Sequence, residues 1–552
     1  MSTKPSELFP EEGLRSLSAK EQLQRAKALN CTIPARSKPE CSKQLHVGIF
    51  FDGTGNNRRD DYESLPPDRR RHSNIVKLFN TYRTNSADGR FAFYIPGVGT
   101  PFPDIGDKGG RLGSIGAWDG ETRIIWAFMM LLNAPIQYTE NSVLIPAEQA
   151  RRISRNLSSS GSPGLQRRVE LKTWQGKLQA RIRNSKPTIE QINLSVFGFS
   201  RGAAEARAFV NWLFEVCEQH AGGWTFAGVP IRLHFLGIFD TVASVGLADL
   251  FGNGIVEGHQ SWADGNMEIH PAVEQCVHFV AGHEVRGCFP LDSVRVRNKY
   301  PSNAMEVMYP GAHSDVGGGY APEALGVSQR NEDMLARIPG YDMYIAAIKA
   351  GVPLLPWSEL SQTARNDLLP SRAIQQRYNA YVRDARIQAG PVEKLHHAHM
   401  SLFFSYRFKY RATLRQRPFF KNASQKDQTY LAVTERTLNE RLRSLQYPVP
   451  VAEPNFDPRE ALKLRRDSMK AAGLQSQDER HIPNRELYRV IESINVSSLT
   501  PGIEALFDYD VHDSMAGFID MGVNEYDGRG SKIPTGNGMG IVRFRKIFTE
   551  NG

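Results

Sequence analysis

Short apolar runs that end in glycine-rich turns recur along this chain, and helix-forming stretches such as 73–82 and 203–220 lie between them. Strands that are buried on both faces of a parallel sheet have this continuous apolar character. The alternation therefore predicts βαβ units and an α/β fold with a mostly parallel sheet flanked by helices. The runs are HVGIFF (46–51), FAFYIPGVGT (91–100), NLSVFGFSRG (193–202), RLHFLGIFDT (232–241) and MEVMYPGAHSDVGGG (305–319).

The pattern divides the 552 residues into four parts. Residues 1–43 are polar and predict a tail or docking arm, and residues 44–325 form the predicted α/β core. Residues 326–480 predict a mainly helical insertion or cap, in which Leu431, Leu438, Leu442 and Leu445 fall on one helical face. Residues 481–552 are expected to return to the core through strands and turns.

Composition limits the cellular setting. The formal net charge is +9, which favours anionic partners. The five cysteines form no CxxC pair, so folding in a reducing compartment is expected. The chain starts without an apolar signal sequence, which predicts a protein made in the cytoplasm. Its longest apolar run, 124–132, is too short to span a bilayer and predicts a buried helix.

The residues Gly198-Phe199-Ser200-Arg201-Gly202 fit the G-x-S-x-G pattern of a nucleophile elbow. The apolar run 194–197 precedes the pattern and a helix-forming stretch follows it, which is the context that the elbow requires. Such a tight turn demands glycine two residues before and after the serine. The pattern therefore predicts Ser200 as a nucleophile whose Oγ is held out at the carboxyl end of the sheet.

A serine hydroxyl needs a base, and the base needs an orienting acid. The chain order Ser, then Asp or Glu, then His is typical of α/β-hydrolases. Asp240 ends an apolar run and is the preferred acid, with Asp249 as the alternative. His313 follows the run 307–309 in a glycine-rich turn and is the preferred base. The rival bases are His512 and His283.

An oxyanion hole needs two N–H donors. One is expected from the backbone of Arg201, and the other from the loop at Gly53 and Thr54, with 97–100 as a second candidate. No metal site or cofactor is expected. The cluster of histidines at positions 396, 397 and 399 lacks matching ligands nearby, so we expect it to lie in a solvated loop.

Taken as an ordered set, these motifs resemble the bacterial GxSxG-type lipase effectors of type VI secretion, in the group built on an uncharacterised α/β-hydrolase domain. The resemblance covers about residues 46–320 and rests on FFDGTGNN, YIPGVGT, GFSRGAAEARAF, GIFDTVASVG and GAHSDVGGGY. It implies phospholipase A activity with Ser200 as nucleophile, His313 as base and Asp240 as acid, while Asp249 stays open.

The resemblance also implies the setting of that activity. Such an effector is injected into the periplasm of a neighbouring bacterium, docks on the spike protein directly or through an adaptor, and has a cognate immunity protein in the producer. Its substrate is membrane phospholipid, which it reaches by peripheral contact without a transmembrane span.

The stretch 403–421 bears on lipid binding, because it interleaves aromatic rings with cations. Rings suit the headgroup region and cations suit anionic lipid. The alternative is a strand with rings inward and the cations Arg407, Lys409 and Arg411 outward.

Two other functions compete with the lipase. One is a carboxylesterase or deacetylase acting on a non-lipid ester. The other is a non-catalytic module that binds protein or nucleic acid, although no nucleic-acid fold signature occurs and no nucleic-acid partner is expected.

Overall fold

The structure is a computed structural model of the 552-residue chain. It describes residues 2–11, 13–31, 42–110, 120–158, 163–220, 222–243, 262–287, 289–517 and 542–549. Asp249, Cys41 and Cys288 lie outside these ranges.

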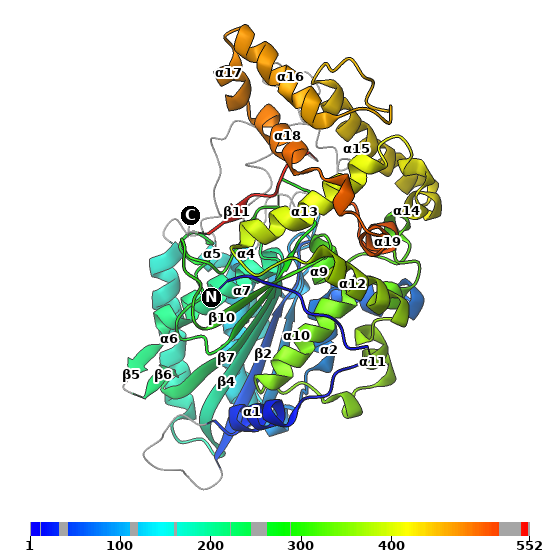
Figure 1. Cartoon of the computed structure of the whole chain (residues 1–552). Coiled ribbons are helices and arrows are strands. Elements are labelled where there is room, and N and C mark those ends of the chain that lie inside the picture. The colour runs from blue at the N-terminus through cyan, green and yellow to red at the C-terminus, as the bar shows by residue number, and fades with distance from the viewer. Residues whose placement is uncertain are drawn as a thin grey trace.

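A twisted sheet runs through the centre of the molecule (Figure 1). Its main path has the order β1-β10-β8-β7-β4-β2-β3, and all neighbours on this path are parallel. The hairpin of β5 (Glu218–His220) and β6 (Gly223–Phe226) adds antiparallel strands beside β7. The path consists of β1 (Lys4–Pro5), β10 (Ala304–Tyr309), β8 (Cys276–Ala281), β7 (Val229–Phe239), β4 (Thr188–Phe199), β2 (Ser42–Phe51) and β3 (Arg90–Ile95).

The central strands are apolar on both faces because helices cover both. In β2, Phe50 joins one hydrophobic cluster while Ile49 and Phe51 join the other, as the two-residue period of a strand requires. One face is covered by α4 (Gly120–Glu140), α5 (Ala147–Ser158), α6 (Pro163–Ile182) and α7 (Arg201–Val216). The other is covered by α2 (Asn74–Thr81), α10 (Arg337–Lys349), α11 (Gln362–Leu368) and α12 (Arg372–Ala385). The predicted α/β fold with a mostly parallel sheet is confirmed.

A second, helical region lies beyond the edge of the sheet at which β4, β7 and β10 end (Figure 1). Its helices are α13 (Val392–Lys409), α14 (Pro418–Asn422), α15 (Gln425–Arg443), α16 (Pro458–Ala471), α17 (Gln475–Arg480), α18 (Ile482–Ser493) and α19 (Pro501–Tyr509). The leucines at 431, 438, 442 and 445, predicted to share one face, are all buried. Because the hydrophobic cluster on the α2–α10 face continues into these helices, the two regions share one core.

The first residues of the chain contact the sheet. Lys4 and Pro5 form β1 at its edge, and Phe9 is buried against the core. The backbone of Phe9 exchanges two hydrogen bonds of 2.8 Å with the side-chain amide of Asn379. After them, α1 (Ala19–Leu29) packs on α10. Apolar and backbone groups at these positions therefore anchor the part of the chain that the sequence predicted to be a tail.

Three local predictions in the second half of the chain were wrong. Residues 403–409 belong to the helix α13 and not to a strand, because their rings find apolar partners all around the helix. His396 and His399 are buried within the same helix and not in a solvated loop. Residues 506–509, which were expected in strands and turns, belong to the helix α19, which Thr500 caps by accepting from the N–H of Ile503.

Candidate functional site

Ser200 stands on the bend between β4 and α7. Its φ of 58° and ψ of −124° form a strained backbone conformation for a residue with a side chain. The Ser200 N–H donates to Phe239 O at 3.0 Å, which holds the bend against the end of β7. A Cβ at Gly198 would lie 2.4 Å from Gly202 O, and one at Gly202 would lie 2.3 Å from Asp52 O. Both glycines are thus required by close packing.

Asp240 and His313 form a buried pair beside this bend. Asp240 follows β7, the direct neighbour of β4, and His313 opens the short helix α9 (His313–Gly317) after β10. His313 Nδ1 lies 2.5 Å from Asp240 Oδ2. The ring of Phe199, the residue before the serine, packs on the imidazole with 4.7 Å between ring centroids. The structure therefore brings all three predicted residues to the same edge of the sheet.

Electrostatics keep the pair in the state that a base requires. Burial alone would raise the pKa of Asp240, but the charge of Arg545 and the hydrogen bond from His313 outweigh it and hold this pKa well below its ordinary value. Burial lowers the pKa of His313 below its ordinary value, although Asp240 opposes the shift. At neutral pH the pair is therefore a carboxylate and a neutral imidazole, ready to accept a proton.

The rival histidines are engaged elsewhere. His512 Nδ1 lies 2.6 Å from Asp315 Oδ1, and its ring stacks on Tyr320 with 3.7 Å between centroids. His283 Nδ1 accepts from the N–H of Gly311 at 2.9 Å, and its Nε2 lies 3.0 Å from Tyr381 Oη. Neither is paired with Asp240 in the described part of the chain. Both tie loops together at the carboxyl end of the sheet.

The loop after β2 lies against the first turn of α7. The Gly53 N–H donates to its neighbour Asp52 Oδ1 at 2.8 Å, while Arg201 Nε donates to Thr54 Oγ1. Burial raises the pKa of Asp52 to about 6. The structure thus places Arg201, Gly53 and Thr54 together next to Ser200, and the N–H of Gly53 is already engaged by Asp52.

Gly97 packs closely against this loop, and the Gly97→Ala variant is expected to lose hydrolytic activity. A Cβ there would lie 1.7 Å from Gly53 O, so the loop must move. Overpacking of this kind costs about 1–3 kcal/mol of unfolding free energy. Urea denaturation and ester hydrolysis measure the two effects.

The matched control is Gly176→Ala, where no atom lies within 4 Å of the new Cβ inside α6. Alanine at that helical position is expected to stabilise by about 0.5–1 kcal/mol and to leave hydrolysis unchanged. Full activity in the Gly97 variant would contradict the supporting role.

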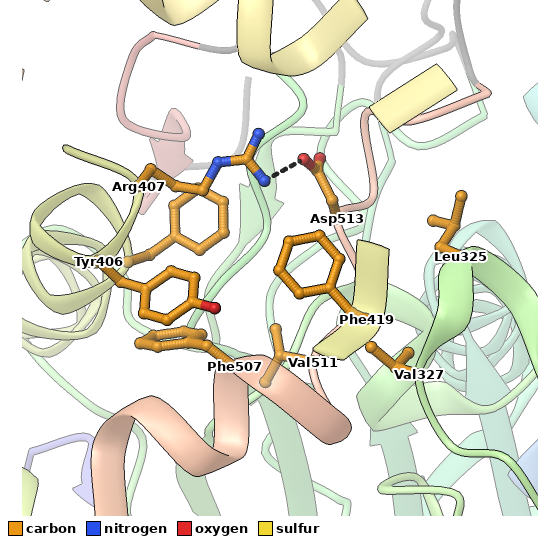
Figure 2. A pocket seen from close by; sticks show the side chains of 9 residues that line it. Leu325, Val327, Tyr406, Arg407, Phe419, Phe507, Val511 and Asp513 are labelled. Atoms are coloured by element: carbon orange, nitrogen blue, oxygen red, sulfur yellow. Dashed lines mark ion pairs between the residues drawn. The ribbon is translucent and has the colours of Figure 1, made fainter. Parts of the chain in front are cut away.

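The aromatic and basic stretch near 403–421 does not form a lipid-facing surface. Tyr406, Phe419 and Phe507 point into a small pocket inside the helical region, as Figure 2 shows. On its wall, Arg407 Nη1 pairs with Asp513 Oδ2 at 2.9 Å. These rings are buried because they form the core of the helical region, so they provide no argument for membrane contact.

Arg545 and Glu284 belong to the site, although the sequence did not single them out. Arg545 Nη1 and Nη2 donate to Asp240 Oδ1 and Oδ2, each at 2.8 Å. Glu284 Oε2 accepts from the backbone N–H of His313 at 3.1 Å. Neither residue stands in a recognisable motif, so no sequence signal pointed to them.

The described residues offer neither a metal site nor a membrane span. Within them, no three His, Cys, Asp or Glu side chains are grouped to hold a metal ion. Every helix in the same ranges is too short or too polar to cross a membrane.

A serine on a strand–helix bend, with an Asp–His pair that follows two other parallel strands of the same sheet, defines an α/β-hydrolase-like protein. Residues 46–217 and 215–344 match the family model described as "T6SS, Phospholipase effector Tle1-like, catalytic domain". These matches cover more than half of the 552 residues. The chain therefore belongs to this family of type VI secretion phospholipase effectors, as the motifs had suggested.

Two solved structures are similar to the chain. An uncharacterized protein from Pseudomonas aeruginosa is 27% identical, with a TM-score of 0.76 over 99% of this chain and 85% of that chain. The sheet and the helical region therefore occur together in that protein as well. The Tle1 effector bound to the VgrG spike from the Type 6 secretion system is 20% identical, with a TM-score of 0.35 over 70% of this chain and 88% of that chain. No curated protein matches the chain.

Proposed function

We propose that this protein is a phospholipase A that hydrolyses a carboxylic ester of membrane glycerophospholipids through Ser200, His313 and Asp240. The observation that carries the proposal is the strained bend at Ser200, which is bonded to Phe239 directly before Asp240 and whose preceding ring, Phe199, packs on the imidazole of the buried Asp240–His313 pair. Membership of a phospholipase effector family supports the choice of lipid over other esters.

The reaction is an acyl transfer in two halves. His313 Nε2 takes the proton of Ser200 as Oγ attacks the ester carbonyl, and Asp240 stabilises the resulting imidazolium. His313 returns the proton to the leaving oxygen, and a lysophospholipid departs. Water, deprotonated by the same imidazole, then releases the fatty acid and restores Ser200.

The oxyanion is stabilised by backbone donors at the start of α7 and in the loop after β2. The N–H of Arg201 opens the helix, where the positive end of the helix dipole favours negative charge. The second donor is the N–H of Thr54, because the N–H of Gly53 already donates to Asp52 Oδ1. The short contact between Arg201 and Thr54 supports this pairing, because it joins the two donor segments.

The setting that we propose follows the family. The protein is carried out by the type VI machinery after docking on a spike protein or adaptor, and it acts at the membrane in the periplasm of the target cell. A cognate immunity protein protects the producer, and contact with the membrane is peripheral.

Product analysis on vesicles tests this function. The vesicles hold a phospholipid with different acyl chains at its two glycerol positions. We expect one free fatty acid and the matching lysophospholipid, and the identity of the acid shows which ester is cut. Hydrolysis of short-chain esters alone would favour a carboxylesterase or deacetylase. Salt-sensitive DNA binding without hydrolysis would favour the non-catalytic module.

A further inference from the structure

The end of the chain reaches into the candidate active site. Residues Ile547–Phe548 form β11, which pairs with β9 (Leu291–Asp292) in the chain that follows β8. The pairing continues beyond the strands, since the N–H of Ser293 donates to Phe548 O at 3.0 Å. This small sheet fixes the backbone just after Arg545.

Arg545 is aimed at Asp240 by this arrangement. Its side chain is buried, its Nε donates to Phe289 O at 2.5 Å, and its two Nη atoms donate to the two carboxylate oxygens at 2.8 Å. A guanidinium that binds both oxygens side by side also fixes the plane of the carboxylate.

The hydrogen-bond donors around Asp240 hold its carboxylate in a single orientation. Oδ1 accepts from the N–H of Ala281 at 2.9 Å and from Arg545, while Oδ2 accepts from His313 and from Arg545. A rotation of the carboxyl group would break bonds on both oxygens together. The Oδ2 atom therefore stays in place for the imidazole.

We infer that Arg545 is a positioning residue for the hydrolytic reaction: it clamps Asp240 so that one oxygen always faces His313. The inference rests on the proposed function only in taking Asp240, His313 and Ser200 as the reacting group. It makes the segment around Arg545 a working part of the active site.

Charge supports the same role. Burial would raise the pKa of Asp240, and Arg545 is the first cause that opposes the rise. Other ionisable groups close to the pair act on its two members as well. They are Glu284 beneath the His313 backbone, Arg286 on Glu284, and His396 on α13. Asp315, two residues after His313 on α9, is itself paired with His512 from the segment after α19.

Removal of the Arg545 charge is expected to shift the acid limb of the pH–activity profile to higher pH. If Asp240 stays ionised, its uncompensated charge raises the pKa of His313, and the base is lost at higher pH. If burial instead raises the pKa of Asp240, the carboxylate is lost as pH falls. Both routes move the limb in the same direction, by about 1–3 pH units on the scale of one opposite charge at this distance.

The experiment measures covalent labelling of the full-length chain by a fluorophosphonate probe as a function of pH. Labelling reports the activated serine directly and needs no lipid, so it is independent of the substrate assigned above. The variants are Arg545→Gln, Arg545→Lys and the control Arg543→Gln. Arg543 is a buried arginine two residues before Arg545. It is a suitable control because the ion pairs of Asp240 in the described residues are with Arg545 and His313.

Arg545→Gln is expected to lower the labelling rate by up to about 100-fold and to raise the midpoint of the acid limb. Arg545→Lys keeps the charge but loses the contact of two nitrogens with both carboxylate oxygens. It should therefore slow labelling about tenfold, with the midpoint of the acid limb near that of the parent. Arg543→Gln should keep the parent's midpoint.

Two results would overturn the inference. One is a uniform loss of rate in Arg545→Gln with an unmoved midpoint, which a merely structural residue would give. The other, decisive even if the glutamine variant fails to fold, is Arg545→Lys labelled as fast as the parent. A parent that is labelled at Ser200 but leaves phospholipid intact would refute the proposed substrate and leave the clamp standing.

Discussion

Ser200→Ala is expected to lower phospholipid hydrolysis by about 10⁵-fold or more, because the variant lacks the attacking oxygen and only binding and oxyanion stabilisation remain. Folding should be preserved. Both serine and alanine carry a Cβ at the strained φ of 58°, so the strain is the same in both proteins. We expect the unfolding free energy to change by less than about 1 kcal/mol.

Fatty-acid release from vesicles and thermal unfolding measure these two quantities on the same samples. Ser195→Ala is the matched control, since Ser195 is a buried serine on β4, five residues before Ser200, whose Oγ faces Val47 O. It should keep activity within a few fold of the parent. A Ser200→Ala protein that retained a substantial share of the activity would refute the nucleophile.

His313→Ala is expected to cost about 10⁴-fold or more in kcat, because Ser200 then has no base and the members of a triad act as one unit. His512→Ala should cost far less. The His512 imidazole is paired with Asp315, so its loss affects the helix that carries His313 and not the proton transfer itself.

Initial rates of ester hydrolysis for the two variants, with circular dichroism to confirm folding, separate the two roles. Each variant removes one buried imidazole bonded to one buried carboxylate, so each serves as the control for the other. A large loss in His512→Ala alone would move the base from position 313 to position 512.

Much of the central architecture was predictable because it depends on short stretches of sequence. A strand buried on both faces must be apolar along its length, so β2, β3, β4, β7 and β10 were visible as runs. The glycines around Ser200 were equally visible, since the bend leaves no room for a Cβ at either position. The end of helix α13 could be mistaken for a strand, because its rings and cations alternate in the sequence although its backbone is helical.

The partners of the reacting residues were not predictable in the same way. Asp240 and Asp249 follow the same stretch of chain, and His313 and His512 both come late, so the order of residues left each choice open. The order of strands decides where Asp240 lies, because β7 is the neighbour of β4 and places its carboxylate beside the Ser200 bend. His313 and Asp240 are separated by 73 positions in sequence and by 2.5 Å in space.

The amino-acid sequence alone therefore determined the layers of the fold and the position of the strained bend at Ser200, because both depend on short-range patterns of burial and backbone geometry. Only the tertiary structure decided which carboxylate meets which imidazole. It also decided that an arginine 305 positions away clamps Asp240. Contacts of this kind depend on strand order and on the path of the last residues, which no local pattern encodes.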